Sequence, residues 1–278
     1  MNKILIIDKP KGLTSRDVVN KVGEFFETTK VGHTGTLDPI ATGVLVITIG
    51  KATKISNLIT SLEKEYIAEC TLGIATDTLD TEGTVTKKQD YNFTKEELIN
   101  VLNSFVGTYN QEVPLYSAIK VNGKKLYEYA RNNIKVDIPK REVTIKEIEL
   151  LEYKDNIFKF RVVVSKGTYI RSLIRDICHK LNTVGIMSNL RRTRQGKYDL
   201  SLSTTLDNIK DDNLISIIDA LDIPSIEITE DIRSDIYNGH KIKNTFNIDK
   251  CLFIDNNKSI AVYEDIDGYL CPSVMILE

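Results

Sequence analysis

The sequence contains no tryptophan and, in 278 residues, only four cysteines, six prolines and three histidines. The cysteines (Cys70, Cys178, Cys251 and Cys271) lie far apart, without the paired spacing of a disulfide framework or zinc knuckle. The adjacent pair Cys178-His179 has no further partners at metal-ligand spacing. These absences argue against a disulfide-stabilised or zinc protein and favour reduced thiols in a cytoplasmic protein.

Long hydrophobic runs are also missing. The longest, from Val44 to Ile49, is interrupted by Thr48 and is far shorter than the roughly 20 residues that cross a bilayer. The N-terminus passes directly into a strand-like segment and lacks the apolar stretch of a signal peptide. We therefore expect a cytoplasmic protein with no membrane association.

The net charge is only −2 at pH 7, but the charges are unevenly distributed. Residues 120–198 carry 19 Lys and Arg against 8 Asp and Glu, whereas residues 199–278 carry 6 against 16. A local basic excess of this size suits binding to a polyanion. An ordinary solvated surface, balanced by the acidic C-terminal segment, explains the same charges, so charge alone leaves both alternatives open.

Hydrophobic periodicity predicts a mixture of strands and helices. Strands are expected at residues 3–8, 43–49, 65–72, 143–152 and 157–165. Helices are expected after Thr14 or Ser15, after the capping box that starts at Thr94, and over residues 51–59, 124–131 and 168–181. From about residue 222 acidic residues accumulate and short strand-like runs follow, so we expect a first domain over residues 1–222 and a small β-domain over residues 223–278.

The first candidate site residue is Asp38, in the segment Gly32-His33-Thr34-Gly35-Thr36-Leu37-Asp38-Pro39. The glycines permit close approach of another molecule, and Pro39 restricts the backbone beside the carboxylate. The segment is expected to be a loop that leads into a buried strand, which would hold Asp38 rigidly. Because Asp-Pro in such a loop is more often a plain turn, the motif alone decides nothing.

Three further features suggest a site. Arg171 is expected on the first turn of a helix, where an arginine calls for a carboxylate or phosphate partner; a solvated pair with Asp176 is the alternative. Tyr66 starts the inner face of the strand at residues 65–72, where core filling is the alternative. Residues 190–194 (Leu-Arg-Arg-Thr-Arg) form a basic cluster that either binds phosphates or is an exposed turn.

Eight ordered blocks of the sequence, taken together, resemble the TruB family of transfer-RNA pseudouridine synthases. The resemblance covers most of the first two hundred residues. The blocks are Asp8–Ser15, Gly32–Leu45, Glu63–Tyr66, Thr76–Asp80, Val113–Lys120, Gly123–Arg131, Lys166–Arg171 and Leu190–Arg192.

The resemblance implies an enzyme that isomerises one uridine in the T-loop of tRNA, at position 55, to pseudouridine. It implies that Asp38 is the catalytic carboxylate that attacks the target nucleoside so that the base can detach, rotate and rejoin through carbon. It assigns Tyr66 to stacking on the target base, and Arg171 to pairing with the catalytic aspartate.

The resemblance also implies substrate-binding residues. His33 matches the histidine associated with flipping the target nucleotide, Leu190 lines the base pocket and Tyr169 lies beside it. The remaining RNA-binding candidates, which lie in the basic segment, are Lys120, Arg191 and Arg192. Residues 114–140 resemble the RNA-clasping insertion of the family.

The fold implied by the resemblance is α+β: a pseudouridine synthase catalytic domain with a mixed, largely antiparallel sheet, followed by a small C-terminal PUA-like β-domain. The implied partner is the T-arm stem-loop of tRNA, with no cofactor, no metal and no obligate protein partner. We expect a monomer. The acidity of residues 199–278 is higher than such an RNA-binding protein would suggest.

Three rival functions are compatible with parts of the sequence. A guide-RNA-dependent enzyme of the dyskerin type would need partner proteins and a larger C-terminal region. A non-catalytic tRNA chaperone would not require Asp38, Tyr66 and Arg171 together. A metal-dependent hydrolase using Asp77 and Asp80 would lack enough ligands.

Overall fold

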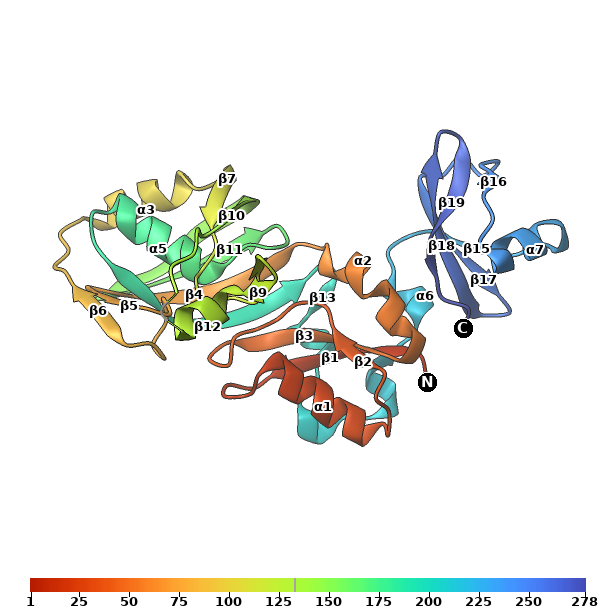
Figure 1. Cartoon of the computed structure of the whole chain (residues 1–278), viewed down its shortest axis with the longest axis horizontal. Helices are drawn as coiled ribbons and strands as arrows, with labels where there is room; N and C mark the ends of the chain where they lie inside the picture. The colour runs from red at the N-terminus through yellow and green to blue at the C-terminus, as the bar shows by residue number, and fades with distance from the viewer. Residues whose placement is uncertain (133) are drawn as a thin grey trace. The chain divides into compact units, whose positions relative to one another are not determined.

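The computed structural model describes residues 1–132 and 134–278, which divide into two compact units (Figure 1). The first unit comprises residues 1–39, 44–61 and 198–278, and the second comprises residues 40–43 and 62–197. Asn133, inside the expected RNA-clasping insertion, lies outside the described residues. Among the residues described, no helix has the length and apolar character needed to cross a membrane.

The first unit is built around the buried strands β1 and β3. Strand β1 lies between β14 and β3, and β2 pairs antiparallel with β3. Its elements up to residue 220 are β1 (Lys3–Lys9), α1 (Ser15–Phe25), β2 (Val31–His33), β3 (Thr42–Ile49), the 3₁₀ helix η1 (Gly50–Ile55), α2 (Ser56–Thr60), β13 (Tyr198–Asp199), η2 (Leu200–Leu202), η3 (Leu206–Asn208), η4 (Asp211–Asn213), β14 (Leu214–Ile215) and α6 (Ile217–Ala220). The expected strands at residues 3–8 and 43–49 are confirmed, whereas the helix expected over residues 51–59 is divided into η1 and α2.

Helix α1 begins where its capping sequence predicts. Thr14 is the N-cap: its hydroxyl accepts from the backbone N–H of Asp17 at 3.1 Å, and the Asp17 carboxylate accepts from Thr14 N at 2.8 Å. The Thr14 hydroxyl and the Thr14 N–H both donate to the Asp17 carboxylate, and these two bonds lower the pKa of Asp17. At the other end of the helix, Phe25 is 55% exposed, so it lies outside the buried face formed by Val18, Val19 and Val22.

The second unit contains a sheet with the strand order β12-β4-β11-β10-β7, in which every neighbouring pair is antiparallel. Thr42 and Gly43, the first residues of β3, pair with β12 in parallel. Its elements are β4 (Lys64–Leu72), β5 (Ile74–Thr76), β6 (Val85–Lys88), α3 (Lys95–Asn103), β7 (Gly107–Glu112), β8 (Lys120–Val121), β9 (Lys124–Lys125), α4 (Leu126–Arg131), β10 (Lys140–Lys154), β11 (Ile157–Val164), α5 (Ile170–Lys180) and β12 (Gly185–Gln195). The expected mixed, largely antiparallel sheet is confirmed.

Helices α3 and α5 lie side by side in the second unit (Figure 1). The capping box at Thr94 is confirmed, because its hydroxyl accepts from Glu97 N and the Glu97 carboxylate accepts from Thr94 N. The apolar side chains of Ile170, Leu173, Ile174 and Ile177 in α5 are buried. Their burial fixes the orientation of α5, and with it the side on which Arg171 projects.

A second sheet forms between Ser225 and Met275, with the order β15-β17-β18-β19-β16. The elements are β15 (Ser225–Glu227), α7 (Glu230–Asn238), β16 (Ile242–Lys243), β17 (Lys250–Asp255), β18 (Lys258–Ile266) and β19 (Tyr269–Met275). Its core includes the fully buried Phe253, Tyr263 and Leu270. This confirms a C-terminal β-domain consistent with a PUA-like one, while the boundary at residue 222 stays a prediction.

Candidate active site

Asp38 lies in the first unit, on a loop whose backbone is fixed on both sides of the carboxylate. On one side, the Ser15 hydroxyl accepts from Leu37 N at 2.8 Å and donates to Leu37 O at 3.2 Å. On the other side, Pro39 O accepts from Gly12 N at 2.8 Å. Asp38 itself is half-buried and adjoins no helix or strand. The loop is therefore anchored to the turn that precedes α1, rather than to a neighbouring strand alone as the sequence suggested.

The anchoring turn depends on Lys9, a residue that sequence reasoning missed as a structural element. Lys9 is fully buried at the end of β1, and its ammonium group donates to Leu13 O at 2.6 Å and Pro10 O at 2.9 Å. It also reaches Pro39 O at 3.4 Å. The charged donor thus joins the two sequence blocks Asp8–Ser15 and Gly32–Leu45 at the candidate nucleophile.

His33 was expected in a loop, but it is the last residue of β2. Its ring is half-buried, and Nδ1 accepts from the backbone N–H of Gly35 at 3.3 Å. Since that bond uses the Nδ1 lone pair, Nε2 carries the proton in the neutral ring. The base-flipping role implied for His33 stays a prediction.

Tyr66, Leu190 and Arg192 share one buried face of the second unit. Tyr66 on β4 lies opposite Arg192 on β12, and Leu190 lies opposite Ala68. All three candidate side chains are at least 94% buried. The segment of residues 190–194 is thus part of a strand, and its reading as an exposed basic turn is wrong.

The same face begins with a buried lysine that the sequence reading placed outside it. Lys64 is 6% exposed, and its ammonium group donates to Leu62 O at 2.7 Å. Burial, together with the positive charges of Arg192 and Lys166, lowers the pKa of Lys64 to about 8. The inner face of β4 therefore starts at Lys64, not at Tyr66.

Arg171 occupies the first turn of α5, as predicted, but it is buried and is not a solvated partner of Asp176. Its guanidinium donates to Thr78 O at 2.9 Å and to Tyr116 O at 3.2 Å. It also lies 3.8 Å from the carboxylate of Asp80. Asp176 instead pairs with Arg175, at 2.8 Å. The orientation of the Arg171 guanidinium is thus fixed by two carbonyls and one carboxylate from loops distant in the sequence.

The Asp80 carboxylate is itself held in place. It accepts from the Thr78 hydroxyl at 2.6 Å and from Glu82 N at 3.1 Å, and the residue is 5% exposed. The alternative role of Asp77 and Asp80 as metal ligands has no support, because the described part of the chain contains no group of His, Cys, Asp and Glu suited to a metal. Within the second unit, Asp80 is instead the ion-pair partner that lies 3.8 Å from Arg171.

The remaining candidates occupy different positions. Tyr169 is half-buried and is the N-cap residue of α5. Arg191 donates to the Thr42 hydroxyl at 3.3 Å. Lys120 is exposed in the short hairpin that β8 forms with β9. Tyr169 therefore adjoins Arg171 along the chain, whereas Lys120 lies in the expected insertion.

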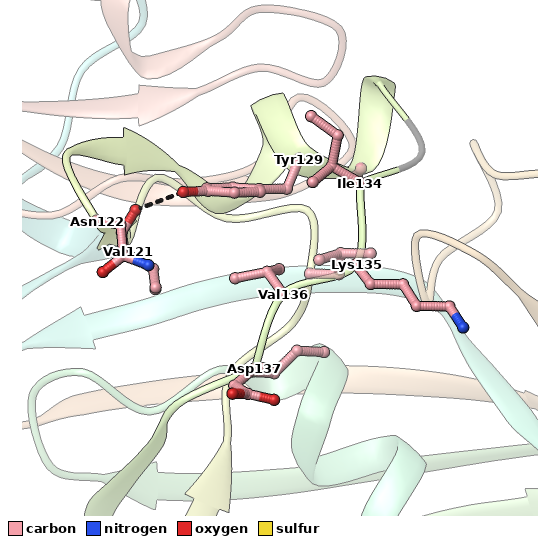
Figure 2. Close-up of a pocket in the computed structure, with 10 residues that line it drawn as sticks. Val121, Asn122, Tyr129, Ile134, Lys135, Val136 and Asp137 are labelled. Carbon is pink, nitrogen blue, oxygen red and sulfur yellow. Dashed lines mark hydrogen bonds between the residues drawn. The ribbon is translucent and has the colours of Figure 1, made fainter.

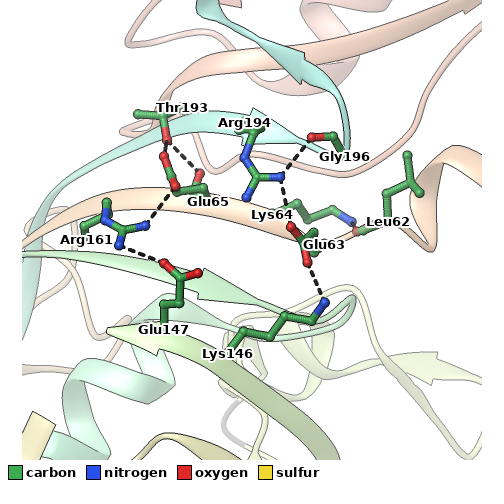
Figure 3. Close-up of polar contacts among 10 residues, drawn as sticks. All are labelled: Leu62, Glu63, Lys64, Glu65, Lys146, Glu147, Arg161, Thr193, Arg194 and Gly196. Atoms are coloured by element: carbon green, nitrogen blue, oxygen red, sulfur yellow. Dashed lines mark hydrogen bonds and ion pairs between the residues drawn. The ribbon is translucent and has the colours of Figure 1, made fainter. Parts of the chain in front are cut away.

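The opposite face of β4 carries a network of exposed ion pairs (Figure 3). Arg161 contacts Glu147 at 2.8 Å and Glu65 at 3.0 Å, and Glu63 accepts from both Lys146 and Arg194. The hydrogen bonds from Lys146 and Arg194 lower the pKa of Glu63. This face is polar and internally paired, whereas the candidate residues Tyr66 and Leu190 project to the other side.

The expected RNA-clasping insertion is partly folded. It contains the β8–β9 hairpin and α4, and it borders a cavity of about 890 Å³ lined by Leu115, Tyr129, Val136 and neighbouring side chains (Figure 2). Tyr129 crosses one side of this cavity and donates to Val121 O at 2.9 Å. The insertion therefore presents a mostly apolar hollow whose charged lining residues are Lys135 and Asp137.

Comparison with known proteins assigns the family. Residues 24–170 match the model of the TruB family pseudouridylate synthase N-terminal domain, which is just over half of the chain. The chain belongs to the TruB family. Residues 171–219 match the model of the tRNA pseudouridylate synthase B C-terminal domain. The first match contains Asp38, Tyr66 and Tyr169, and the second match begins at Arg171.

Curated TruB relatives are similar over nearly their whole length. The tRNA pseudouridine synthase B of Clostridium kluyveri is 39% identical over 274 residues, covering 94% of this chain and 95% of that protein. The protein of the same name from Lactobacillus acidophilus is 40% identical over 294 residues, covering 100% and 99%. The relative from Caldanaerobacter subterraneus is 44% identical over 253 residues, covering 90% and 89%.

Solved structures share the fold. The crystal structure of a Cbf5-Nop10-Gar1 complex matches with a TM-score of 0.74 at 24% identity, covering 99% of this chain and 85% of that chain. An H/ACA RNP bound to a substrate RNA containing 2'-deoxyuridine matches with a TM-score of 0.72 at 22% identity, covering 99% and 85%. At this identity the similarity shows the pseudouridine synthase fold of this TruB chain.

Proposed function

We propose that this chain isomerises the T-loop uridine at position 55 of tRNA to pseudouridine, with Asp38 as nucleophile. Isomerisation of uridine to pseudouridine in tRNA is the function of the TruB family, to which the chain belongs. The observation that carries the assignment to Asp38 is the anchored loop. Hydrogen bonds from Ser15 and Gly12 fix the backbone immediately before and after the carboxylate, while Asp38 stays half-buried.

The reaction requires the target uridine to leave the folded loop. Extruding a base costs a few kcal/mol of stacking, and an aromatic side chain returns about 1–3 kcal/mol per base. In this proposal Tyr66 supplies the stacking surface, Leu190 and Tyr169 line the base pocket, and His33 assists flipping. The burial of Tyr66 and Leu190 on one sheet face supports their shared role.

The chemical step uses charge that the chain itself supplies. An ionised carboxylate acts as a nucleophile without a separate general base. Arg171 is proposed to pair with Asp38, because opposite charge favours the ionised carboxylate. Two backbone carbonyls orient the guanidinium, and the Asp80 carboxylate lies 3.8 Å from it. Isomerisation breaks the bond from the sugar to base nitrogen 1 and forms one from the same sugar carbon to base carbon 5. Carbon 5 loses a proton and nitrogen 1 gains one, so the step consumes no oxidant.

RNA binding is assigned to the basic segment. Lys120 in the β8–β9 hairpin and Arg191 on β12 are proposed to contact phosphates of the T-arm. Arg192, which is 1% exposed, is proposed to contribute to substrate binding from the buried face that carries Tyr66. The insertion over residues 114–140 is proposed to clasp the RNA. The chain is further proposed to act in the cytoplasm, as a monomer and without an obligate protein partner; light scattering of the protein with and without tRNA tests this assembly.

The deciding experiment is tritium release from tRNA that carries uridine labelled at carbon 5. The wild type is compared with Asp38→Asn and with Asp207→Asn, a control at an exposed carboxylate of the same unit. We expect release by the wild type and the control, none by Asp38→Asn, and a modified site at position 55. Absence of release by a folded wild type that binds tRNA would contradict the proposal, as would retained activity of Asp38→Asn.

A further inference from the structure

Gln111 is buried on β7 and faces the start of α5. Its side chain is 1% exposed, although β7 is an edge strand and its neighbour Asn110 is exposed. A buried primary amide is unusual unless all its polar atoms have partners. The partners of Gln111 lie at the residue from which α5 begins.

The Gln111 amide binds both backbone groups of Tyr169. Its Oε1 accepts from Tyr169 N at 2.8 Å, and its Nε2 donates to Tyr169 O at 3.2 Å. The same Nε2 donates to the Tyr109 hydroxyl at 2.7 Å. The Gln111 side chain thus bonds the N–H and the C=O of one residue, as the backbone of a neighbouring strand would.

Tyr169 is the N-cap residue of α5, and this helix has no side-chain cap hydrogen bond. The Tyr169 carbonyl also accepts the first helical bond, from Leu173 N at 3.0 Å. Because an N-cap residue sets the direction in which the first turn leaves, Gln111 fixes the start of α5 in place of a capping side chain. Arg171 follows two residues later.

We infer that Gln111 is a positioning residue for the reaction, acting through the backbone of Tyr169 on the Tyr169 ring and the Arg171 guanidinium. The inference rests on the proposed function. Arg171 makes its two carbonyl bonds to Thr78 and Tyr116 only if its backbone lies at the right distance from both loops. A small rotation at the N-cap would displace the guanidinium and the ring together.

The Tyr109 hydroxyl extends this connection along the helix. It accepts from Gln111 and donates to the Asp176 carboxylate at 3.4 Å, while Asp176 pairs with Arg175. Burial and the nearby Asp176 charge raise the pKa of Tyr109, so the hydroxyl stays a donor throughout the working pH range. The later turns of α5 therefore keep contacts to β7 that do not require Gln111.

The test compares Gln111→Met, which keeps the shape but removes all three hydrogen bonds of the amide, with Asn110→Ala on the exposed side of the same strand. Kinetics of tritium release should show kcat reduced about tenfold to 100-fold in Gln111→Met, with KM for tRNA changed less than about threefold. Asn110→Ala should match the wild type in both. A kcat of Gln111→Met within about threefold of wild type, or a loss confined to KM, overturns the inference.

A second variant supplies a pH signature. In Gln111→Glu an ionised carboxylate can accept from Tyr169 N but cannot donate to Tyr169 O, whereas the protonated acid can do both. The ratio of its kcat to that of the wild type should therefore rise as pH falls from about 8 to about 6, since burial favours the neutral acid. A ratio independent of pH contradicts positioning by the donated bond.

Hydrogen exchange separates this inference from the proposed function. Amides of residues 168–172 should exchange faster in Gln111→Met, while those of residues 175–180 stay protected as in the wild type. If the wild type proves inactive on tRNA but this exchange pattern appears, the function is wrong and the structural positioning stands. Unchanged exchange at residues 168–172 overturns the inference whatever the activity.

Discussion

Two arginines of the second unit bind carboxylates in opposite surroundings. Arg161 projects from the polar face of the sheet, where Glu147, Glu65 and Glu149 lie within 3.3 Å and the side chain is 29% exposed. Arg171 is 7% exposed, and its nearest Asp80 oxygen is 3.8 Å away, while its hydrogen bonds to Thr78 and Tyr116 go to backbone carbonyls. The partly exposed arginine contacts three carboxylates, whereas the buried one contacts two backbone carbonyls and lies farther from a carboxylate.

The ion pairs of Arg161 and the contacts of Arg171 therefore differ in what they contribute: the first to stability, the second to the reaction. Exposed ion pairs contribute about 0–1 kcal/mol each, because water screens them and the side chains lose freedom. Carbonyl dipoles, by contrast, orient a buried guanidinium and leave it a full positive charge, which is what stabilisation of a reacting carboxylate requires. The comparison predicts that changes at Arg171 affect catalysis and that changes at Arg161 affect only stability.

The largest effect is expected for Arg171→Met. The substitution removes the donor to Thr78 O and Tyr116 O and leaves Asp80 without its ion-pair partner, which costs about 3–5 kcal/mol at a buried pair. We expect kcat to fall by about 1,000-fold or more. Single-turnover tritium release at saturating tRNA measures this loss, and Arg171→Lys should recover little because an ammonium group cannot make the forked contact. Activity within tenfold of the wild type would contradict the comparison.

A pH effect is expected at Lys64, on the same buried face as Tyr66. Its pKa is about 8 in the folded protein and 10.5 ordinarily. Between these values the unfolded chain binds more protons, so stability rises with pH, and below pH 8 the full cost of the buried charge is present. From pH 7.5 to 9.5 the free energy of unfolding should rise by about 2 kcal/mol more in the wild type than in Lys64→Met.

Urea unfolding of both proteins at the two pH values measures that difference. The contributions of titratable groups that both proteins share cancel in the subtraction. Equal pH dependence of the wild type and Lys64→Met would mean that Lys64 is solvated in the folded state. A steeper gain in the variant would reverse the sign of the effect.

A smaller catalytic effect is expected for Asp80→Asn. Asparagine keeps an acceptor for the Thr78 hydroxyl and Glu82 N but removes the negative charge beside Arg171. Loss of one charged partner corresponds to about 1–3 kcal/mol, and we expect kcat to fall about tenfold. Asp77→Asn is the matched control in the same loop, and it should stay within about threefold of the wild type. An equal loss in both variants would assign the effect to the loop, not to the charge.

The buried Arg171 also shows what local sequence could predict. The capping signals and apolar stripes placed α1, α3 and α5 correctly, because those signals act within a few residues. The alternation over residues 65–72 identified the inner face of β4, although it missed Lys64, since a lysine breaks an apolar pattern. Local spacing thus gave the first turn of α5 and the strand carrying Tyr66.

The partners of Arg171 were beyond that kind of prediction. Thr78 and Tyr116 lie 93 and 55 residues from it in the sequence, and they contribute carbonyl groups that every residue type carries. The role of Gln111 could not be predicted for the same reason, because its hydrogen-bond partners are the backbone groups of Tyr169. The roles of the site residues came from family resemblance, which records such contacts without explaining them.

The smallest effect is expected for Arg161→Met on the polar face. Two exposed carboxylates, Glu147 and Glu149, and the half-buried Glu65 lose their common partner, but all three are in contact with water, so the free energy of unfolding should fall by about 1 kcal/mol or less. The loss should shrink in 1 M salt, where screening acts over about 3 Å. Catalysis should match the wild type, because Arg161 projects away from the face that carries Tyr66 and Leu190. Urea unfolding at low and high salt, together with tritium release, measures both parts. A tenfold loss of kcat here would extend the functional surface to the second face of the sheet and end the distinction between the two arginines.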